Sequence, residues 1–574
     1  AMKMEHVIRA PAAGMVRALP VAVGDTLTEG QPVVLLDPAA SEETEPVQEQ
    51  KTDLDAPRAD LAEAVARHHT GLDEARPAAV AARHAKGRRT ARENLADLCD
   101  EGSFTEYGAL ALAAQRRRRT LDDLIANTPA DGMVTGTCTV NADIVGVENA
   151  DCVALSYDYT VLAGTQGLMN HRKTDRLLEI AERRRAPVVL IAEGGGGRPG
   201  DTDTTSVAGL DLGTFQQMGR LSGLVPLVGI ASGYCFAGNA ALLGCCDVVI
   251  ATHGSSIGMG GPALIEGGGL GSYRPSEVGP LDVQAANGVV DVTAADDAEA
   301  VRVARRYLAY FQGPTADWTA PDQRLLRHVV PENRRRAYEV RDAVEGLADT
   351  GSVLELRRGF GAGAVTALIR VEGRPMGLIA SNPAHLGGAI DSDAADKAAR
   401  FLQLCDAFGL PVVSLCDTPG FMVGPEAEQT ATVRHFSRLF VTGANLSVPV
   451  CALILRKAYG LGAMAMLGGS TRVPVATAAW PSGEIGAMGL EGAVRLGYRR
   501  ELEAITDPAA RERAFQERVD ELYADGKALN AAAVLEIDDV IDPAESRSWI
   551  ASAFRDHEVA PARDGKRRPY VDTW

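Results

Sequence analysis

The feature that most constrains the fold of this 574-residue chain is an internal repeat with a constant spacing. Pro187 in one apolar block corresponds to Pro411 in another, and Gly238 corresponds to Gly462; both spacings are 224 residues (411 − 187 and 462 − 238). A constant spacing between separated blocks indicates a duplicated unit rather than a chance similarity. The matching blocks are Ala186–Gly195 with Leu410–Gly420, and Val225–Gly244 with Val448–Gly469.

In each half, apolar stretches typical of strands alternate with amphipathic stretches typical of helices. This alternation predicts an α/β fold with a buried sheet. In the first half we expect strands at 152–162, 187–193, 225–232 and 247–252, and helices at 167–185 and 235–244. In the second half we expect two strands within 364–381, strands at 411–417, 448–456 and 472–480, and helices at 391–408 and 461–468. The halves should meet within 313–331, where glycine, proline and charged residues cluster.

Composition excludes several classes of protein. The chain is 46% hydrophobic and 23% charged, as in an ordinary globular protein, and is long enough for two or more domains. Its net charge of −18 argues against binding to nucleic acid. The nine cysteines are mostly in apolar runs without metal-site spacing, which favours a reducing cytoplasm and no metal site. No apolar run is long enough to cross a membrane.

The loops of the repeat predict two sites for negatively charged oxygen. In each half an apolar strand enters a glycine-containing turn that opens a helix of small residues. Small side chains let backbone N–H groups approach a ligand, and the first N–H groups of a helix have no partner within it. We therefore predict one oxyanion hole at Ala237 and Gly238 and a second at Leu461 and Gly462. The alternative is that these glycines only permit close packing of helix on strand.

The N-terminus predicts attachment of a cofactor. Lys3 lies between two methionines, ahead of short β-rich runs at 6–8, 14–16 and 33–36, as in a hairpin that accepts biotin. The alternatives are a hairpin with an ordinary solvated lysine and a lipoyl carrier, although lipoyl lysines usually follow aspartate. Only two residues precede Lys3, so we expect 1–38 to be half of a small β-barrel carrier and part of a longer polypeptide.

A flexible linker is expected at 39–70. Its first part, as far as residue 57, is rich in Ala, Glu, Gln and Pro, with few large apolar side chains to bury. A tethered carrier needs a segment that spans the distance to its site. A simple spacer between domains is an equally good interpretation.

Biotin and two oxyanion holes together suit one reaction, the transfer of a carboxyl group from carboxybiotin to the α-carbon of an acyl-CoA. That reaction forms two oxyanions, the enolate of the thioester and the enolate of the biotin ureido group. Removing one hole donor typically costs about 2.7–4 kcal/mol of catalysis. The released biotin accepts the α-proton, so no protein base is required.

Specific motifs resemble the carboxyltransferase component of biotin-dependent acyl-CoA carboxylases. They are Arg88–Gly108, Asp131–Thr137, Asp158–Gly167, Lys397–Phe421, Arg456–Gly460 and Trp480–Val494. The resemblance implies two duplicated domains of the crotonase (ClpP/crotonase) fold, at 71–320 for acyl-CoA and 321–574 for biotin. It also implies a trimer of dimers, with sites between subunits, and an upstream biotin carboxylase that uses ATP, Mg and bicarbonate. With that partner the enzyme is a carbon–carbon ligase of fatty acid metabolism, as in single-chain acyl-CoA carboxylases.

The resemblance assigns further residues to the two sites. On the biotin side they are Lys3 for attachment, with Tyr459, Gly460, Asp417, Gly420 and Phe421. On the acyl-CoA side they are Gly164, Thr165, Gly195, Gly196 and Met464. Met464 replaces an aspartate that helps to select acyl length in relatives, which predicts a different and longer acyl group. Gly233–Asn239 and Glu193–Arg198 also depart from the family pattern.

Other interpretations are weaker. Gly254–Gly258 matches the G-x-S-x-G pattern of serine hydrolases, but Gly260-Gly261-Pro262 does not begin a long helix promptly. The glycines at 194–197 lack the Lys-Ser/Thr of a phosphate loop. The arginines at 116–119 are expected at an edge or near CoA phosphates. Two rival functions stay open, a biotin-dependent decarboxylase that uses the same site in reverse and a noncatalytic scaffold that docks the carrier.

Overall fold

The computed structural model describes residues 6–39, 53–203, 206–207, 209–557 and 565–574. The chain divides into two compact units, Ala1–Val65 and Ala66–Trp574. Lys3 and residues 40–52 of the predicted linker lie outside the described residues. None of the described helices is both long and apolar enough to cross a membrane.

The N-terminal unit holds a two-stranded antiparallel sheet of β1 (Gly14–Ala18) and β2 (Leu35–Pro38). The predicted strand at 6–8 is absent, and β2 lies two residues later than expected. Every described residue from 6 to 39 is exposed or half-buried. An isolated hairpin has too little apolar surface to bury, as expected for half of a barrel.

The predicted flexible linker is wrong at its C-terminal end, because helix α1 (Ala59–His69) occupies that part. The helix carries acidic Asp60 in its first turn and three basic residues in its last turn, which oppose the helix dipole favourably. The prediction rested on the composition of the residues before 57, and it wrongly extended the linker beyond them to residue 70.

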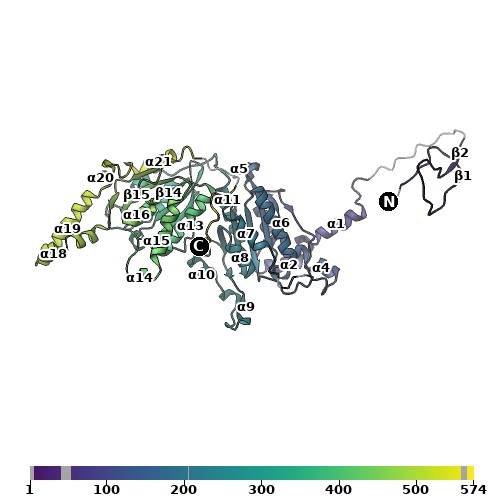
Figure 1. Cartoon of the computed structure of the whole chain (residues 1–574), viewed down its shortest axis with the longest axis horizontal. Helices are drawn as coiled ribbons and strands as arrows, with labels where there is room; N and C mark the ends of the chain where they lie inside the picture. The colour runs from purple at the N-terminus through teal and green to yellow at the C-terminus, as the bar shows by residue number, and fades with distance from the viewer. Residues whose placement is uncertain (1–5, 40–52, 204–205, 208, 558–564) are drawn as a thin grey trace. The chain divides into compact units, whose positions relative to one another are not determined.

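The large unit contains two eight-stranded sheets, one in each half of the sequence (Figure 1). The first has the order β10-β8-β7-β6-β5-β4-β3, with β9 paired to β7, and the second has the order β11-β12-β13-β14-β15-β16-β18, with β17 paired to β15. The strands of the first sheet are β3 (Thr105–Glu106), β4 (Met133–Thr139), β5 (Asp151–Tyr157), β6 (Val188–Gly194), β7 (Leu227–Phe236), β8 (Val248–Thr252), β9 (Ser256–Gly258) and β10 (Val292–Ala294). Those of the second are β11 (Leu354–Leu356), β12 (Ala364–Val371), β13 (Arg374–Ser381), β14 (Val412–Thr418), β15 (Val450–Tyr459), β16 (Ala476–Ala479), β17 (Glu484–Gly486) and β18 (Asp539–Val540).

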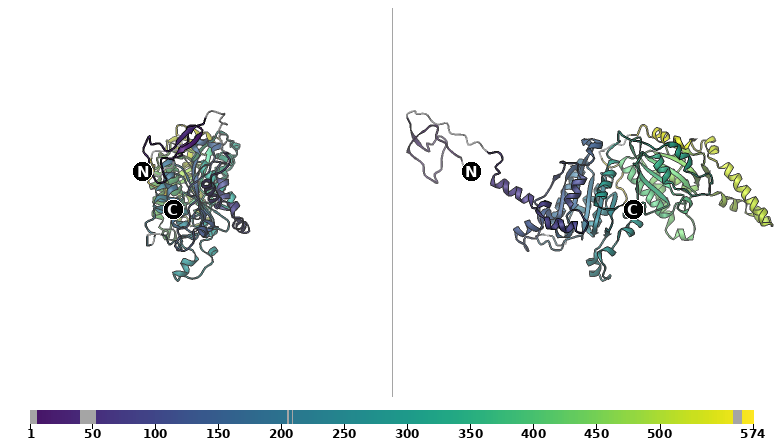
Figure 2. Two further views of the ribbon diagram at one scale, coloured as in Figure 1. Left: turned by 90° about the vertical axis from the view of Figure 1, so that its right-hand side faces the viewer. Right: turned by 180° about the vertical axis from the view of Figure 1, so that it is seen from behind.

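Helices surround both sheets, and two groups project from them (Figures 1 and 2). In the first half the helices are α2 (Pro77–His84), α3 (Ala91–Leu98), α4 (Leu121–Asn127), α5 (Ala142–Val145), α6 (Leu168–Arg184), α7 (Thr214–Leu221), α8 (Gly238–Gly244), α9 (Pro262–Gly267), α10 (Leu281–Ala286) and α11 (Asp297–Ala309). In the second half they are α12 (Arg341–Leu347), α13 (Ser392–Phe408), α14 (Pro425–Glu428), α15 (Thr432–Ala444), α16 (Gly460–Met466), α17 (Leu490–Gly497), α18 (Arg499–Ala504), α19 (Pro508–Asp525), α20 (Ala528–Ala533) and α21 (Ser546–Ala553). The views show α9 on one projection and α18 with α19 on another.

The duplication predicted from the sequence is confirmed in the coordinates. Strands β6 and β14 coincide residue for residue at the spacing of 224, and so do helices α6 and α13. The central strands are parallel and fully buried, which explains their continuous apolar runs. The short helices after β7 and β15 are present, although α8 begins three residues later than expected.

The two halves share one continuous core and are joined by the C-terminal residues. One apolar cluster contains Val228 of the first sheet and Ile379 of the second. Val571 is buried and exchanges two hydrogen bonds with the Ser222 hydroxyl of the first half (3.0 and 3.2 Å). Arg357 of the second half donates to the carbonyl of Thr573 (3.0 Å). These contacts fix the two sheets relative to each other.

Candidate functional site

In the first half, β7 turns into α8 through one residue with an unusual backbone. Ala237 has φ +52° and ψ −122°, and its N–H donates to the carbonyl of Gly258 (3.0 Å). The prediction that Ala237 supplies a hole donor is therefore wrong, because its N–H is used to hold β9. The amides of Gly238 and Asn239, the first two residues of α8, have no acceptor among the described residues. The N–H of Ala240, the third residue of α8, likewise has no acceptor there, so the first turn of α8 presents three free donors, of which those of Gly238 and Asn239 come first after the turn.

In the second half, β15 turns into α16 in a similar way. Gly460 has φ +55° and begins the helix, and the N–H groups of Leu461 and Gly462 have no acceptor in the described part of the chain. The strand pairs Phe236–Gly258 and Tyr459–Gly486 are equivalent. Counting forward from them aligns Gly238 with Leu461 and Asn239 with Gly462. The spacing of the repeat is 224 residues at β6 and β14 but 223 throughout β7 and β15 (450 − 227 and 459 − 236), so it shifts by one residue before these strands. This shift explains why the sequence alignment misplaced the first pair of donors.

A second loop closes on each of these helix starts. In the first half Gly196 (φ +85°) lies so close to Ala237 that an added Cβ would stand 2.6 Å from the Ala237 Cβ. In the second half a Cβ on Gly462 would stand 2.7 Å from Gly420. Only glycine allows backbones to approach in this way. The predicted residues Gly196 and Gly238 are thus brought together, and so are Gly420 and Gly462.

Further predicted residues line these loops. Gly164 packs directly on the Glu193 carbonyl, and Gly195 is exposed beside it. The Thr165 hydroxyl and carbonyl both accept hydrogen bonds from Arg198 (3.2 and 2.9 Å). On the second side, Phe421 stacks on Phe436 of α15, with ring centroids 4.0 Å apart. Leu461 and Met464 are exposed on the first turns of α16, where a ligand can reach them.

Two residues predicted to bind biotin serve the fold of the site instead. Asp417 is fully buried, and its carboxylate accepts from Arg456 Nε and from the N–H of Lys457 (both 3.1 Å). Tyr459 is also buried, in a cluster with Leu490, Val494 and Val519. Neither side chain is exposed to a ligand at α16. Gly460 contributes its left-handed backbone to the turn.

The first site is supported by a buried ion pair. Glu193 accepts two hydrogen bonds from the guanidinium of Arg83 (2.9 and 2.7 Å), which lies on α2 outside the repeated region. Burial raises the pKa of Glu193, and the Arg83 cation opposes that effect. Asp131 is also buried beside Arg198, and burial raises its pKa. The loops of the first site are therefore tied to the core by arginines.

Sequence reasoning missed three residues of the first site. Asn239 is fully buried and contacts the predicted loops at Gly164 and Gly196 with its side chain. Gln166 lies over the Cα of Gly238, since a Cβ there would stand 1.9 Å from its Oε1. Arg198 follows the glycine run and holds Thr165. A signal existed for Asn239 and Arg198, because both lie in segments that depart from the family pattern.

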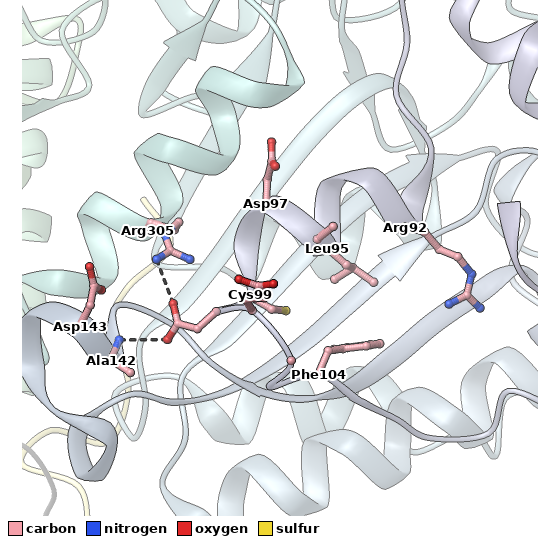
Figure 3. Close-up of a pocket in the computed structure, with 12 residues that line it drawn as sticks. Arg92, Leu95, Asp97, Cys99, Phe104, Ala142, Asp143 and Arg305 are labelled. Atoms are coloured by element: carbon pink, nitrogen blue, oxygen red, sulfur yellow. Dashed lines mark hydrogen bonds and ion pairs between the residues drawn. The ribbon is translucent and has the colours of Figure 1, made fainter. Parts of the chain in front are cut away.

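Figure 3 shows a cavity of about 780 Å³, whose lining includes no residue of either helix start. It lies between α3 and α11 and is lined by Arg92, Cys99 and Arg305. Arg305 is paired with Asp100 (3.0 Å), and Arg92 is paired with Glu106 (2.9 Å). Because its cations are already neutralised, this cavity has no free charge for a CoA phosphate.

The hydrolase pattern is explained by the fold. Ser256 is buried in β9, and the next helix, α9, begins only at Pro262. A nucleophile elbow requires a strand–turn–helix with an exposed serine. Among the described residues there is also no group of three or more His, Cys, Asp or Glu side chains that could hold a metal ion.

The fold and these turns define a class of protein, a duplicated crotonase-like α/β protein in which each half presents free main-chain N–H groups at the start of a short helix. Comparison with known proteins makes the assignment specific. The carboxyl transferase domain family matches residues 82–567, and a family of biotin-requiring enzymes matches residues 1–36. The chain therefore belongs to the carboxyl transferase family, whose members include the carboxyltransferases of biotin-dependent acyl-CoA carboxylases.

Individual relatives agree. The 12S subunit of methylmalonyl-CoA carboxyltransferase from Propionibacterium freudenreichii subsp. shermanii is 34% identical over 491 residues, which are 83% of this chain and 90% of the relative. A solved single-chain, multi-domain long-chain acyl-CoA carboxylase is 59% identical with a TM-score of 0.83. That match covers 96% of this chain and 53% of the other, so this chain spans about half of it. The hexameric transcarboxylase 12S structure with bound methylmalonyl-CoA is 32% identical over 89% of this chain and 97% of that chain, with a TM-score of 0.74. The predicted family, fold class and biotin dependence are confirmed.

Proposed function

We propose that this chain transfers a carboxyl group from carboxybiotin to the α-carbon of an acyl-CoA. The observation that carries the proposal is the pair of free amide donors at equivalent helix starts, Gly238 with Asn239 and Leu461 with Gly462. Each pair lies at the end of a buried strand on a turn that is fixed by glycine. Two sites for negative oxygen match a transfer in which charge develops on the donor and on the acceptor.

The first pair would stabilise the thioester oxygen of the acyl-CoA. When the α-carbon loses its proton, negative charge moves onto that oxygen, and the N–H groups of Gly238 and Asn239 would donate to it. Biotin that has released its carboxyl group accepts the α-proton, so no protein base is needed. The buried Glu193 is paired with Arg83 and is not available as that base.

The second pair would hold the oxygen of the biotin ring. Biotin supplies an activated carboxyl group when it is carried into the site. The exposed Leu461 side chain and the Gly420–Phe421 loop would contact the carbon skeleton of the biotin ring system, while the free amides of α16 would face its ureido oxygen. The fit supports binding of biotin through the main chain, with Phe421 held by Phe436.

The larger assembly follows from the same proposal. We expect biotin on Lys3, and an upstream biotin carboxylase that uses ATP, Mg and bicarbonate to load it. The two half-sites would meet between subunits of a hexamer, as expected for a trimer of dimers. This assembly is related to the hexamer of the 12S transcarboxylase. We also propose a cytoplasmic location and a role in fatty acid metabolism.

We propose a long acyl group as the substrate. Met464 is about 40% exposed, two residues beyond Gly462 on α16. An apolar side chain at this position contributes favourable contact with an apolar chain and offers no partner to a polar group. The relationship to a single-chain long-chain acyl-CoA carboxylase supports the same choice.

The proposal is tested with the purified chain, free biotin and a carboxylated acyl-CoA, by measuring transfer of the carboxyl group to biotin, which is the reverse of the proposed reaction. Gly238→Ala is expected to lower the rate at least about 100-fold, because a Cβ would collide with Gln166 and displace the donors. Gly244→Ala, at the other end of the same helix, has nothing within 4 Å of the new Cβ and serves as the matched control. Equal activity in the two variants would contradict an oxyanion site, and a scaffold would show no transfer even in the unmodified chain. The rival decarboxylase runs the same transfer from the carboxylated acyl-CoA to biotin, so it is favoured if the carboxybiotin formed goes on to release CO2 instead of returning the carboxyl group to an acyl-CoA.

A further inference from the structure

The most unusual polar group in the first site is the side chain of Asn239. It is fully buried, at the second position of α8. Its Oδ1 accepts from the N–H of Gly196 (3.0 Å), and its Nδ2 donates to the carbonyls of Gly164 (3.2 Å) and Glu193 (3.4 Å). Because Oδ1 faces an N–H and Nδ2 faces two carbonyls, the partners determine the orientation of the amide. One side chain thus joins three segments of the backbone.

These three segments are the ones that surround the free donors. Gly164 belongs to the turn before α6, Glu193 is the penultimate residue of β6, and Gly196 lies in the loop that closes on Ala237. The main-chain N–H of Asn239 is itself one of the free donors at the start of α8. Asn239 therefore has two parts to play: its main-chain N–H is a free donor, and its side chain acts as a brace, that is, it holds the three backbone segments together by hydrogen bonds.

In the second half, the loop is positioned against the helix start in a different way. Gly462 stands at the position equivalent to Asn239, three residues after the equivalent strand ends at Phe236 and Tyr459. Without a side chain, Gly462 lets Gly420 lie directly against the helix, since a Cβ there would be only 2.7 Å away. In the first half an amide side chain fills this space. The loop at Gly196, which is equivalent to Gly420, is therefore held at the distance that Asn239 sets.

We propose that Asn239 is a positioning residue of the acyl-CoA site, whose side chain holds the Gly164 and Gly196 loops around the thioester. This inference rests on the proposed function. It adds that the Asn239 side chain determines the positions of the loops on the acyl-CoA side without contacting the loops on the biotin side. Misplacing reacting groups by about 1 Å can cost about 100-fold in rate. Loss of the side chain should therefore slow transfer although both main-chain donors stay in the sequence.

The first test compares Asn239→Ala with the unmodified chain in the biotin carboxylation assay. We expect kcat/KM for the acyl-CoA to fall about 10- to 100-fold. The KM for free biotin should change less than twofold, since Asn239 touches only the acyl-side loops. The inference would be overturned if activity toward the acyl-CoA and toward biotin fell equally, in proportion to a loss of folded protein.

The matched control is Asn382→Ala. Asn382 is also buried, at the end of β13 in the second half, and bonds only to backbone, with the carbonyl of Ala362 (2.8 Å) and the N–H of Ala384 (3.1 Å). Its loss should lower thermal stability to a similar extent and leave kcat/KM for the acyl-CoA within about threefold. If this control reproduces the acyl-side loss, Asn239 acts only through stability.

The second test uses Asn239→Asp, which keeps the shape of the side chain. The ionised carboxylate still accepts from Gly196 but repels the carbonyls of Gly164 and Glu193. Its protonated form donates to a carbonyl as the amide does. The activity of Asn239→Asp, divided by that of the unmodified chain at the same pH, should therefore rise as the pH falls. The nearby Glu193 carboxylate is paired with Arg83 in both chains, so it contributes equally to both. A ratio that is independent of pH would contradict the brace.

Binding separates this inference from the proposed function. Calorimetric titration with an acyl-CoA needs no turnover, so it works even if the unmodified chain transfers no carboxyl group. Acyl-CoA affinity that falls in Asn239→Ala, with an inactive unmodified chain, would support the brace and reject the reaction. Unchanged affinity together with unchanged kcat in a folded variant would reject the brace alone.

Discussion

Glu193 and Asp417 occupy the same position in the two halves, 224 residues apart (417 − 193), and each is a buried carboxylate paired with an arginine. The partners come from different places. Arg456 belongs to β15 of the same half, whereas Arg83 belongs to α2, which precedes the repeat. The duplicated fold therefore has one half that neutralises its charge internally and one that depends on an added N-terminal helix.

This dependence predicts that Arg83→Met destabilises the chain strongly. Removing one partner of a buried pair typically costs about 3–5 kcal/mol because the other charge stays buried. The thermal midpoint of unfolding should fall by several degrees, and adding Glu193→Gln should restore part of it by removing the uncompensated charge. Arg176→Ala, which breaks an exposed pair with Glu179, should change the midpoint little. An Arg83 variant as stable as this control would contradict the role of α2.

The biotin side is expected to fail when Gly462 receives a side chain. A Cβ at this position would lie 2.7 Å from the Gly420 backbone, which cannot move aside as a flexible side chain can. Gly462→Ala should lower kcat/KM for free biotin about 100-fold while acyl-CoA affinity, measured by calorimetry, is retained. Gly497→Ala is the control, because its Cβ has nothing within 4 Å. Loss of acyl-CoA binding in the Gly462 variant would show that the halves do not act separately.

Two buried lysines at equivalent positions predict a dependence of stability on pH. Lys173 of α6 and Lys397 of α13 each donate to two backbone carbonyls, and burial lowers their pKa values to about 8 and about 7. Unfolded lysine has a pKa near about 10.4, so the unfolded chain binds more protons between these values. The contribution of these lysines to stability must therefore rise with pH from about 7 to about 10.

Substitution by methionine checks this sign. Lys397→Met removes the cost of burying a charge, so its thermal midpoint should compare most favourably with the unmodified chain near pH 7. The difference should then shift in favour of the unmodified chain as the pH rises toward 10. A difference that is constant across this range would contradict a lowered pKa for Lys397. Lys86→Met, at an exposed position, provides the baseline.

Met464 predicts acyl-chain selectivity. Replacing it by aspartate places a charge on the exposed face of α16 where an apolar chain is expected to pass. The ratio of kcat/KM for a long acyl-CoA to that for propionyl-CoA should fall about tenfold, within the range for a change in one pocket side chain. Val433→Asp changes an exposed apolar residue on α15 and serves as the control. An unchanged ratio in the Met464 variant would remove this residue from the acyl site.

The sequence by itself determined the architecture and the family. Buried parallel strands require continuous apolar runs, and these runs recur in both halves, so the duplication and the order of the central strands and of the helices between them could be predicted from the sequence. The glycines at 196, 238, 420 and 462 were also found, because a close neighbour at the Cα, or a positive φ at Gly420, leaves no good alternative to glycine. Burial in a sheet and close contact at a turn each restrict the residue type at single positions, so they can be recognised in the sequence.

The tertiary structure alone decided which amides are free and which side chains support them. Ala237 lost its predicted role because its N–H bonds to Gly258, a partner 21 residues away that no local pattern indicates. Asp417 and Tyr459 looked like ligand contacts but are buried. Asn239 gained a role because three separate segments converge on it. Hydrogen bonding is decided by distances of a few tenths of an ångström between distant segments, and only the packed fold fixes these distances.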